Sequence, residues 1–421
     1  MRTLAEWLTL QESVHPKTID MGLARVTAVA RALGVDKPGC PVITVGGTNG
    51  KGSTVTHLEA FLRATGAKTG MFTSPHFIRY NERIQVSGVE ATDAELVTAF
   101  ERIEQARGST TLTFFEFNLL AALLIFAARR VDVAILEVGL GGRLDAVNLV
   151  DADVAVVCSI GLDHRDYLGD TLDLIGAEKA GIFRARRPAV LGTDDMPASV
   201  YAAIIALEAR AVVAAKDFTW KIEESGHWIY SGLHLSLHNL PPSALDGEIQ
   251  YRNAATALAA LEALGTATLN ERVASEALRA VRLPGRFQVV RSGELEWILD
   301  IAHNEPAAVI FAQNVQQWVA HKPGKTFAVV GILNDKDAGG IAAATKPVVD
   351  HWVLCALPGP RGTSAAALEK RMGLTGLPVT LFGSVEEGCE WVRATAKPGD
   401  RVLVFGSFHT VGPAMQWLGL Y

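Results

Sequence analysis

The residues with the clearest capacity for chemistry lie in the glycine-rich stretch Gly47-Thr-Asn-Gly-Lys-Gly-Ser53, which follows the apolar run Pro41-Val-Ile-Thr-Val45. Glycines let backbone N–H groups converge on an anion, and a helix that begins here directs its positive end at the same point. Lys51 adds a mobile positive charge, and the Ser53 hydroxyl is a suitable magnesium ligand. The stretch therefore predicts a loop that binds nucleotide phosphates. An ordinary turn between a strand and a helix is the alternative.

This loop departs from the standard P-loop pattern. That pattern requires a glycine at the position of Val45 and a hydroxyl residue directly after Lys51, where this chain has Gly52. The strand before the loop and the amphipathic segment after it nevertheless favour nucleotide binding. We therefore expect ATP contacts from the loop residues Thr48, Asn49, Gly50, Lys51, Gly52 and Ser53.

Two further polar residues follow apolar strands. Glu137 comes directly after Val133-Ala-Ile-Leu136, and open parallel sheets carry functional groups at this carboxyl edge. A carboxylate there is a suitable oxygen ligand for magnesium, although a solvated glutamate is the alternative. His164 follows the strand predicted at 154–160, but imidazole is a poor match for magnesium. Taken alone, His164 is more typical of a hydrogen-bonded structural residue.

The elements that must position these residues alternate between short apolar runs and helical patterns. Strands are predicted at 42–45, 69–72, 131–136, 154–158 and 189–191. This alternation is typical of a doubly wound parallel sheet with helices on both faces. Residues 217–238 instead predict antiparallel strands around Gly226, as a small β appendage of the same domain. The apolar run 119–128 predicts a buried helix, since a bilayer span needs roughly 20 residues.

A second α/β domain is expected after a helical pair at 254–264 and 271–281. Leu283-Pro-Gly-Arg286 is a chain breaker of the kind found between domains. Strands are then predicted at 296–301, 326–330, 351–355, 379–381 and 401–405. We therefore predict a P-loop-type parallel-sheet ATPase domain over 1–285 and a Rossmann-like α/β domain over 286–421.

Composition excludes several classes of protein. The net charge of −6 gives no electrostatic footprint for nucleic acid or a lipid surface. The four cysteines, Cys40, Cys158, Cys355 and Cys389, lack C-x-x-C spacing, which favours reduced thiols. Glu6 lies within a short amphipathic N-terminal pattern, unlike a signal peptide. We expect a cytoplasmic protein, working as a monomer on small molecules, with no nucleic acid or membrane partner.

The glycine-rich loop resembles the ATP loop of the Mur ligase superfamily, and the whole chain resembles the folylpolyglutamate synthase and dihydrofolate synthase family. The motifs that carry this resemblance are Thr73-Ser-Pro-His76, Tyr80-Asn-Glu-Arg83, Thr113-Phe-Phe-Glu116, Leu136-Glu-Val-Gly-Leu-Gly-Gly-Arg-Leu-Asp145, Leu162-Asp-His164, Glu178-Lys-Ala-Gly-Ile182, Arg252-Asn-Ala-Ala-Thr256, Leu283-Pro-Gly-Arg-Phe287, Asp300-Ile-Ala-His-Asn304 and Gly406-Ser-Phe-His-Thr410. The resemblance implies an ATP-dependent amide ligase that joins L-glutamate to 7,8-dihydropteroate and extends reduced folates to polyglutamates. Such a ligase activates a carboxylate as an acyl phosphate and gives ADP and phosphate.

The resemblance also implies the metal site. Ser53 would hold a first Mg²⁺, with Ser74 on a loop approaching the metal and ATP, although a turn-capping serine is the alternative there. Glu137 and His164 would hold a second Mg²⁺. Lys179 is carbamylated in the family, whereas a surface salt bridge with Glu178 or Asp173 is the alternative. Lys51, Lys179 and His164 are the expected catalytic residues, and a monovalent cation such as K⁺ is a further candidate.

Substrate contacts are assigned in the same way. Thr113, Phe115 and Asp145 resemble the pterin site, and Arg83 is expected to face the substrate carboxylate unless it forms a surface ion pair with Glu82. The resemblance places Asn253 at the adenine base, Arg286 at phosphate, and Asp300, His303 and Asn304 at ATP. The segment 331–337, together with Ser407 and His409, is expected near the incoming glutamate. Glu305 before Pro306 departs from the family pattern and leaves the roles of His303 and Asn304 open.

Three alternatives remain open from the sequence: a folylpolyglutamate synthase without dihydropteroate activity, a non-catalytic nucleotide-binding relative, and a Mur-type ligase of cell-wall precursors. The Thr113–Glu116 motif and Asp145 favour the bifunctional activity. The sequence does not indicate the preferred folate, the polyglutamate length, the balance of the two activities or the proton acceptor for the glutamate amine.

Overall fold

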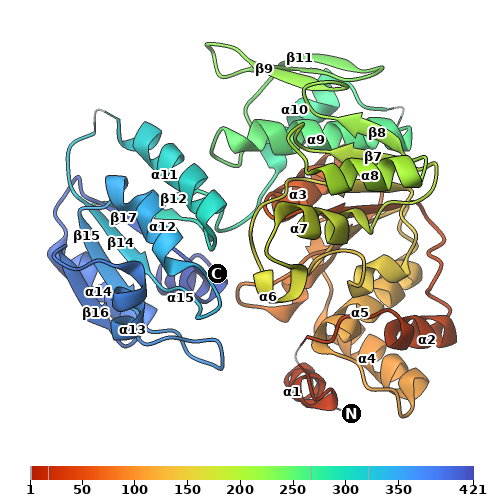
Figure 1. Ribbon diagram of the computed structural model, residues 1–421, viewed down its shortest axis with the longest axis horizontal. Helices are drawn as coiled ribbons and strands as arrows, with labels where there is room; N and C mark the ends of the chain where they lie inside the picture. The colour runs from red at the N-terminus through yellow and green to blue at the C-terminus, as the bar shows by residue number, and fades with distance from the viewer. Residues whose placement is uncertain (1, 18, 267, 321) are drawn as a thin grey trace. The chain divides into compact units, whose positions relative to one another are not determined.

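The computed structural model describes residues 2–17, 19–266, 268–320 and 322–421. The chain forms two compact units, drawn from red to green and from cyan to blue in Figure 1. The first unit comprises Met1–Ala244 and Gln250–Arg282, and the second comprises Leu245–Ile249 and Leu283–Tyr421. The short segment Leu245–Ile249 thus belongs with the second unit although it lies within the sequence of the first.

An eight-stranded sheet forms the centre of the first unit, in the order β4-β3-β2-β5-β1-β6-β7-β8. Its strands are β1 Val42–Gly46, β2 Thr69–Phe72, β3 Ile84–Val86, β4 Val89–Glu90, β5 Val133–Glu137, β6 Val154–Val157, β7 Pro188–Leu191 and β8 Arg210–Val213. The six strands from β2 to β8 in this order are parallel, which confirms the predicted sheet. Strand β3 pairs antiparallel with β2, and the edge strand β4 pairs antiparallel with β3. Neither was predicted, because each is too short to show alternation, and the edge strand β8 was not predicted either.

The helices of this region begin mostly at polar capping residues. They are α1 Leu4–Val14, α2 Ala24–Leu33, α3 Lys51–Ala64, α4 Asp93–Arg107, α5 Phe114–Arg129, α6 Arg165–Leu168, α7 Leu172–Ala180, α8 Ala198–Ala206, α9 Ile249–Leu264 and α10 Glu271–Ala280, with single turns at η1 Tyr80–Arg83 and η2 Ala146–Leu149. Thr92 and Thr113 cap α4 and α5, each paired with a glutamate three residues later. These capping boxes fix where both helices start.

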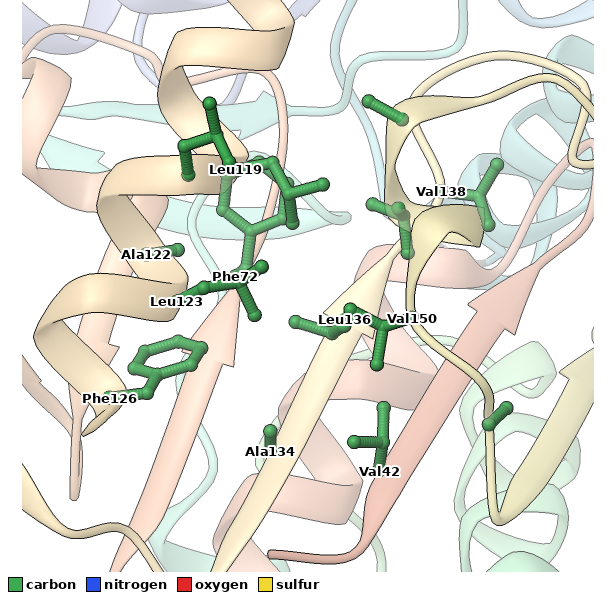
Figure 2. Close-up of a cluster of buried hydrophobic side chains, with 14 of the residues drawn as sticks. Val42, Phe72, Leu119, Ala122, Leu123, Phe126, Ala134, Leu136, Val138 and Val150 are labelled. Carbon is green, nitrogen blue, oxygen red and sulfur yellow. The ribbon is translucent and has the colours of Figure 1, made fainter. Parts of the chain in front are cut away.

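Helix α5 is the buried helix that the apolar run predicted. In Figure 2, Leu119 and Phe126 on one side of α5 lie against Phe72 of β2 and the neighbouring strand β5. A Cβ atom on Gly70 of β2 would lie 2.7 Å from the Phe126 ring, so only glycine admits that ring at this position. No helix in the described part of the chain is long and apolar enough to cross a membrane.

The predicted β appendage is a three-stranded antiparallel sheet in the order β11-β10-β9. Its strands are β9 Thr219–Ile222, β10 Trp228–Ser231 and β11 Ser236–Leu240. Tyr230 of β10 is buried, and its hydroxyl donates to Glu262 Oε2 of α9 at 3.0 Å. This hydrogen bond attaches the appendage to the helical part of the first unit.

The second unit has a six-stranded sheet in the order β12-β13-β17-β14-β15-β16. Its elements are β12 Gln288–Ser292, β13 Leu295–Leu299, α11 Glu305–Val319, β14 Thr326–Val330, α12 Ala338–Thr345, η3 Lys346–Val348, β15 His351–Cys355, α13 Ala365–Met372, β16 Val379–Phe382, α14 Val385–Thr395, β17 Arg401–Phe405 and α15 Phe408–Trp417. Strand β12 is antiparallel to β13, and all other pairs are parallel. The Rossmann-like prediction is confirmed, but it omitted β12, whose residues are half-buried or exposed.

Candidate functional site

The glycine-rich loop connects β1 to α3 at the carboxyl edge of the first sheet. Gly50 is the N-cap of α3 with φ 89°, and Gly47 has φ 139°, both in the region that favours glycine. A Cβ atom on Gly47 would lie 3.1 Å from the Cβ atom of Cys158. The loop therefore lies close against the residue after β6, which explains why position 47 has no side chain.

The segment after β6 holds the loop in place. Thr48 donates its backbone N–H to the Ser159 carbonyl oxygen at 2.7 Å, and its hydroxyl accepts the N–H of Gly161 at 3.0 Å. The Ser159 hydroxyl donates to the carbonyl oxygen of Asn49 at 3.0 Å. Ser159 was not singled out from the sequence, although a hydroxyl residue directly after a buried strand is a usable signal. It fixes the backbone that is expected to contact phosphate.

Two lysine side chains converge on this loop. Lys51 Nζ donates to the carbonyl oxygens of Gly47 at 3.0 Å and Thr48 at 3.2 Å. Lys179 Nζ, from the last turn of α7, donates to the same Gly47 oxygen at 3.0 Å. Lys179 is 5% exposed, so the predicted alternative of a surface salt bridge is wrong. Glu178 instead pairs with Arg143, whose Nη2 lies 2.7 Å from Glu178 Oε1.

Burial, together with the smaller effect of the Lys51 charge, lowers the pKa of Lys179 to about 7, although Asp163 and Asp145 act in the opposite direction. The Lys179 amine is thus partly uncharged near neutral pH. An uncharged amine is a nucleophile, which is the condition for reaction with carbon dioxide.

The residues expected at the metal lie around the same edge. Ser53, in the first turn of α3, is 3% exposed, and Glu137, at the end of β5, is 5% exposed. Glu137 is the register partner of Val45, just before the loop. Ser74 is half-buried after β2 and donates its backbone N–H to Glu137 Oε2 at 3.2 Å. The structure therefore brings Ser74 and Glu137 together.

His164 occupies the turn after β6 as the N-cap of α6, with a left-handed φ of 50°. Its Nε2 lies 3.9 Å from Asp163 Oδ2, and the side chain is half-buried. Within the described ranges, no three His, Cys, Asp or Glu side chains gather as a metal cluster. The oxygen donors Ser53, Ser74 and Glu137 nevertheless fit magnesium, which uses few protein ligands and completes its shell with water and phosphate oxygens.

Asn253 of α9, the residue expected at adenine, lies beside the loop. Its Oδ1 would be 3.0 Å from a Cβ atom on Gly50. The side chain is 3% exposed, and its Nδ2 donates to Gln250 Oε1 at 3.0 Å. This contact fixes the orientation of the amide next to the N-terminus of α3.

Asp145 and Phe115 meet at Gly139. A Cβ atom on Gly139 would lie 2.7 Å from Phe115 Cε2 and 3.3 Å from Asp145 Oδ2. The Asp145 carboxylate accepts the backbone N–H groups of Leu140 at 2.8 Å and Val147 at 3.0 Å. Burial raises the pKa of Asp145 to about 6, and these hydrogen bonds limit the rise. The structure thus places an aromatic ring and a buried carboxylate on either side of Gly139.

Thr113 and Arg83 have clear local roles near Phe115. The Thr113 side chain caps α5 by accepting the Glu116 N–H at 3.2 Å. Arg83 is 8% exposed, donates Nε–H to His76 Nδ1 at 2.7 Å, and lies 5.3 Å from the centre of the Phe114 ring. The predicted alternative of a surface ion pair for Arg83 is therefore wrong, because the side chain is buried. Burial lowers the pKa of Arg83.

In the second unit, the expected residues gather at the carboxyl ends of β13 and β17. Asp300 accepts the N–H groups of Phe287 at 2.8 Å and Ala302 at 2.9 Å. Desolvation raises the pKa of Asp300, and Arg286 lowers it in part. The Arg286 guanidinium carbon lies 5.7 Å from the Phe408 ring centre. Arg286 and Asp300 are therefore close to the start of α15.

The remaining predicted residues of this unit lie at helix starts. Ser407 caps α15 by accepting the His409 N–H at 3.1 Å, and His303 is half-buried before α11. Asn304 caps α11 by accepting the Ala307 N–H at 3.0 Å. Glu305 is accommodated as the first residue of α11, so the departure from the family pattern leaves Asn304 as the capping residue.

A parallel sheet with a phosphate-type loop, followed by a separate Rossmann-like sheet, defines the class of Mur ligases. Residues 45–261 match the model of the Mur ligase middle domain, and residues 285–408 match that of the Mur ligase glutamate ligase domain. The chain belongs to the dihydrofolate synthase/folylpolyglutamate synthase family of these ligases, as its curated relatives show.

Relatives of that name match nearly end to end. The dihydrofolate synthase/folylpolyglutamate synthase of Escherichia coli (strain K12) is 46% identical over 414 residues, covering 98% of this chain and 95% of that protein. The protein of the same name from Haemophilus influenzae is 39% identical, covering 97% and 96%. The structure described as E. coli FolC in complex with DHPP and ADP superposes with a TM-score of 0.94 at 44% identity, covering 100% of this chain and 98% of that chain. A bifunctional folylpolyglutamate synthase/dihydrofolate synthase with Mn, AMPPNP and L-glutamate bound has a TM-score of 0.91 at 41% identity, covering 100% and 98%.

Proposed function

We propose that this protein joins L-glutamate to 7,8-dihydropteroate to form dihydrofolate, and extends reduced folates to polyglutamates, with ATP converted to ADP and phosphate. The observation that carries the proposal is the pair Lys51 and Lys179, which meets at the Gly47 carbonyl oxygen, with Glu137 opposite Val45 on the neighbouring strand. Positive charge and a hard carboxylate ligand at the carboxyl edge of a parallel sheet suit phosphoryl transfer. The names of the E. coli and H. influenzae relatives support the same activity.

The chain's own residues supply positioning and charge. Backbone N–H groups of the glycine-rich loop and the Lys51 ammonium group bind the ATP phosphates and offset the negative charge that develops on the transferred group. The acceptor carboxylate attacks the terminal phosphorus, and the resulting acyl phosphate is attacked by the amine of glutamate, which releases phosphate. Ser53, Ser74, Glu137 and His164 would hold magnesium, which supplies further neutralisation of phosphate charge when bound. The structures solved with Mn and AMPPNP or with ADP support nucleotide and divalent metal use.

We propose the following places for the substrates. Phe115 offers its ring to the pterin, Asp145 accepts hydrogen bonds from its amino-pyrimidine edge, and Thr113 lines the same pocket. Arg83 faces the acceptor carboxylate. Asn253 contacts adenine, and Arg286, Asp300 and His303 are further ATP-binding residues. Ser407 and His409 lie on the side of the incoming glutamate.

Lys179 is proposed to carry a carbamate. Its nitrogen attacks the carbon of carbon dioxide, one N–H proton passes to solvent, and an anionic carboxylate-like group results. That anion would remove the repulsion between the two lysines and support the metal site. Protein equilibrated with ¹³C-labelled bicarbonate should show a carbamate carbonyl signal by NMR that is absent from Lys179→Met.

The enzyme is further proposed to work as a monomer in the cytoplasm, with two magnesium ions and with K⁺ as a monovalent activator. Multi-angle light scattering tests the oligomeric state. Replacing K⁺ by Na⁺ in the assay tests the monovalent ion.

The decisive experiment is a ligation assay with ATP, magnesium, dihydropteroate and glutamate. The wild type should release phosphate and form dihydrofolate, and Lys51→Ala should abolish both. Lys221→Ala, on the exposed strand β9, is the matched control and should retain activity. Release of no phosphate by the intact protein would refute the proposal. Activity with tetrahydrofolate but not with dihydropteroate would instead identify an elongating enzyme alone.

A further inference from the structure

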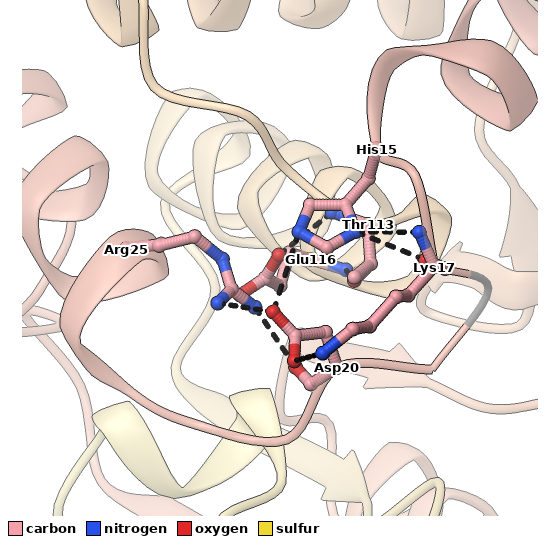
Figure 3. Close-up of polar contacts among 6 residues, drawn as sticks. All are labelled: His15, Lys17, Asp20, Arg25, Thr113 and Glu116. Carbon is pink, nitrogen blue, oxygen red and sulfur yellow. Dashed lines mark hydrogen bonds and ion pairs between the residues drawn. The ribbon is translucent and has the colours of Figure 1, made fainter.

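The segment between α1 and α2 is joined to the start of α5 by one arginine (Figure 3). Arg25 Nη1 lies 2.6 Å from Asp20 Oδ2, and Nη2 donates to the Asp20 carbonyl oxygen at 2.8 Å. The same Nη2 lies 3.2 Å from Glu116 Oε1. A single guanidinium thus connects two carboxylates that are far apart in the sequence.

Glu116 is a buried carboxylate, and pairing with Arg25 offsets the cost of burying its charge. It is 3% exposed, and its Oε2 accepts the backbone N–H of Thr113 at 2.7 Å in the capping box of α5. A buried carboxylate is costly unless it is paired and hydrogen-bonded. Arg25 supplies the charge that the capping box lacks, so it stabilises the first turn of α5, which carries Phe115.

The same segment contacts the loop that carries Asp145. Gly22 donates its N–H to the Leu144 carbonyl oxygen at 3.2 Å. Met21 Cε would lie 3.4 Å from a Cβ atom on Gly141. The residues after Asp20 therefore lie against the Gly141–Asp145 loop, while Arg25 fixes Asp20 to α5.

Asp20 has two other neighbours, His15 and Lys17, and within the described residues neither forms a hydrogen bond or ion pair with α5. His15 Nε2 lies 3.3 Å from Asp20 Oδ2, and Lys17 Nζ lies 3.5 Å from Oδ1. The Lys17 side chain is 68% exposed, and exposed ion pairs contribute little. The Arg25 side chain is only 27% exposed and contacts both Asp20 and Glu116, so it is the residue that connects the two.

We propose that Arg25 is a positioning residue for the pteridine acceptor, because it sets the separation between Phe115 on α5 and Asp145 on the neighbouring loop. This inference rests on the proposed function. Arg25 acts through Glu116 and through residues 20–22. The contacts of Arg25 do not include the glycine-rich ATP loop, so ATP binding should be insensitive to its loss.

The test compares Arg25→Met with Arg31→Met in the ligation assay. Arg31 is on the same helix, and its 72% exposed side chain is 3.7 Å from Asp36. Arg25→Met should raise KM for dihydropteroate by about tenfold or more, because charged hydrogen bonds are lost. Its KM for ATP should stay within about twofold of the wild-type value, and Arg31→Met should match the wild type in both constants. A purely structural role would lower the amount of active enzyme without separating the two KM values.

Glu116→Gln provides a second variant that retains the shape of the capping box. It should raise KM for dihydropteroate as well, and adding Arg25→Met to it should raise KM by much less than Arg25→Met does alone. Additive effects, or equal changes in KM for ATP and dihydropteroate, would overturn the inference. A wild type that fails to ligate would instead refute the proposed function, so the two failures are distinguishable.

Discussion

Lys51 and Lys179 donate to the same oxygen atom, the backbone carbonyl of Gly47, each at 3.0 Å. Two ammonium groups on one acceptor repel each other, and burial makes the charge on Lys179 more costly still. The pKa of Lys179 falls to about 7 as a result. The site therefore contains, at Lys179, an amine that loses its proton near neutral pH.

Replacing Lys179 should stabilise the protein while inactivating it. Because the pKa of Lys179 is about 7 when folded and 10.5 ordinarily, the unfolded chain binds more protons between these values. The Lys179 contribution to the free energy of unfolding therefore rises with pH across this window. In CO₂-free buffer, Lys179→Met should be more stable than the wild type by about 1–4 kcal/mol near pH 7. The difference should shrink towards pH 10, as measured by urea unfolding.

Lys221→Met is the control for the Lys179 prediction, since this side chain lies on an exposed strand. Its stability should follow the wild type at every pH. An advantage of Lys179→Met that grows between pH 7 and pH 10 would contradict the assigned direction of the pKa shift.

Asp145 should make acceptor binding depend on pH. Its pKa of about 6, raised from 3.8, means that the carboxylate is protonated as the pH falls through 6. The protonated form loses acceptor capacity towards the pterin, so KM for dihydropteroate should rise in this range, with KM for ATP little changed. Asp145→Asn should raise KM for dihydropteroate by roughly tenfold and remove this pH dependence. A pH dependence that persists in Asp145→Asn would assign it to another group.

Much of the fold could be predicted from the sequence, because the spacing of apolar residues and the residue types that form turns both depend on neighbouring positions in the chain. Four strands, Thr69–Phe72, Thr326–Val330, His351–Cys355 and Arg401–Phe405, have the predicted limits, since their apolar runs are fully or almost fully buried and each follows a polar residue. Strands β3, β4, β8 and β12 were missed. Strands β4, β8 and β12 lie at sheet edges and β3 lies next to one, and all four have mixed burial, so their residues show no clear alternation.

The candidate site was predictable in its loop but not in its supporting contacts. The glycines, Lys51 and Ser53 form a glycine-rich pattern that by itself predicts a phosphate-binding loop. The hydrogen bonds of Thr48 with Ser159, and of Lys179 with Gly47, join residues more than a hundred positions apart. Such contacts depend on how β1, β6 and α7 come together, which no local pattern encodes. The burial of Arg83 likewise depends on Phe114 from another element.

Gly139→Ala should weaken binding of the pteridine acceptor. The new methyl group would lie 2.7 Å from the Phe115 ring, closer than carbon atoms approach, so the ring must move. Overpacking of this kind costs about 1–3 kcal/mol. We expect a similar loss in kcat/KM for dihydropteroate, with KM for ATP unchanged. Gly39→Ala, where nothing lies within 4 Å, is the control and should behave as the wild type. Equal effects at both glycines would contradict the proposed contact.

His57 of α3 is a buried residue that the sequence did not single out. Its Nδ1–H donates to the carbonyl oxygen of Ser53 at 2.8 Å, and its Nε2 accepts the hydroxyl of Ser243 at 2.9 Å. The carbonyl can only accept, which fixes the neutral tautomer. Burial lowers the pKa of His57 to about 4. The imidazole therefore connects the start of α3 to the chain just before the segment Leu245–Ile249 as an uncharged ring.

His57→Gln should make the protein less sensitive to acid. The unfolded chain binds more protons than the folded one between the folded pKa of about 4 and the ordinary value of 6.5, so the wild type loses stability as the pH falls through this range. Glutamine has no such titration. At neutral pH His57→Gln should be less stable by about 1–2 kcal/mol, because glutamine does not reproduce both hydrogen bonds. Urea unfolding at several pH values should show this deficit shrinking as the pH falls, while His238→Gln, at an exposed position, leaves the pH profile unchanged. A deficit that widens in acid would mean that His57 is charged in the folded protein and that its two hydrogen bonds are assigned wrongly.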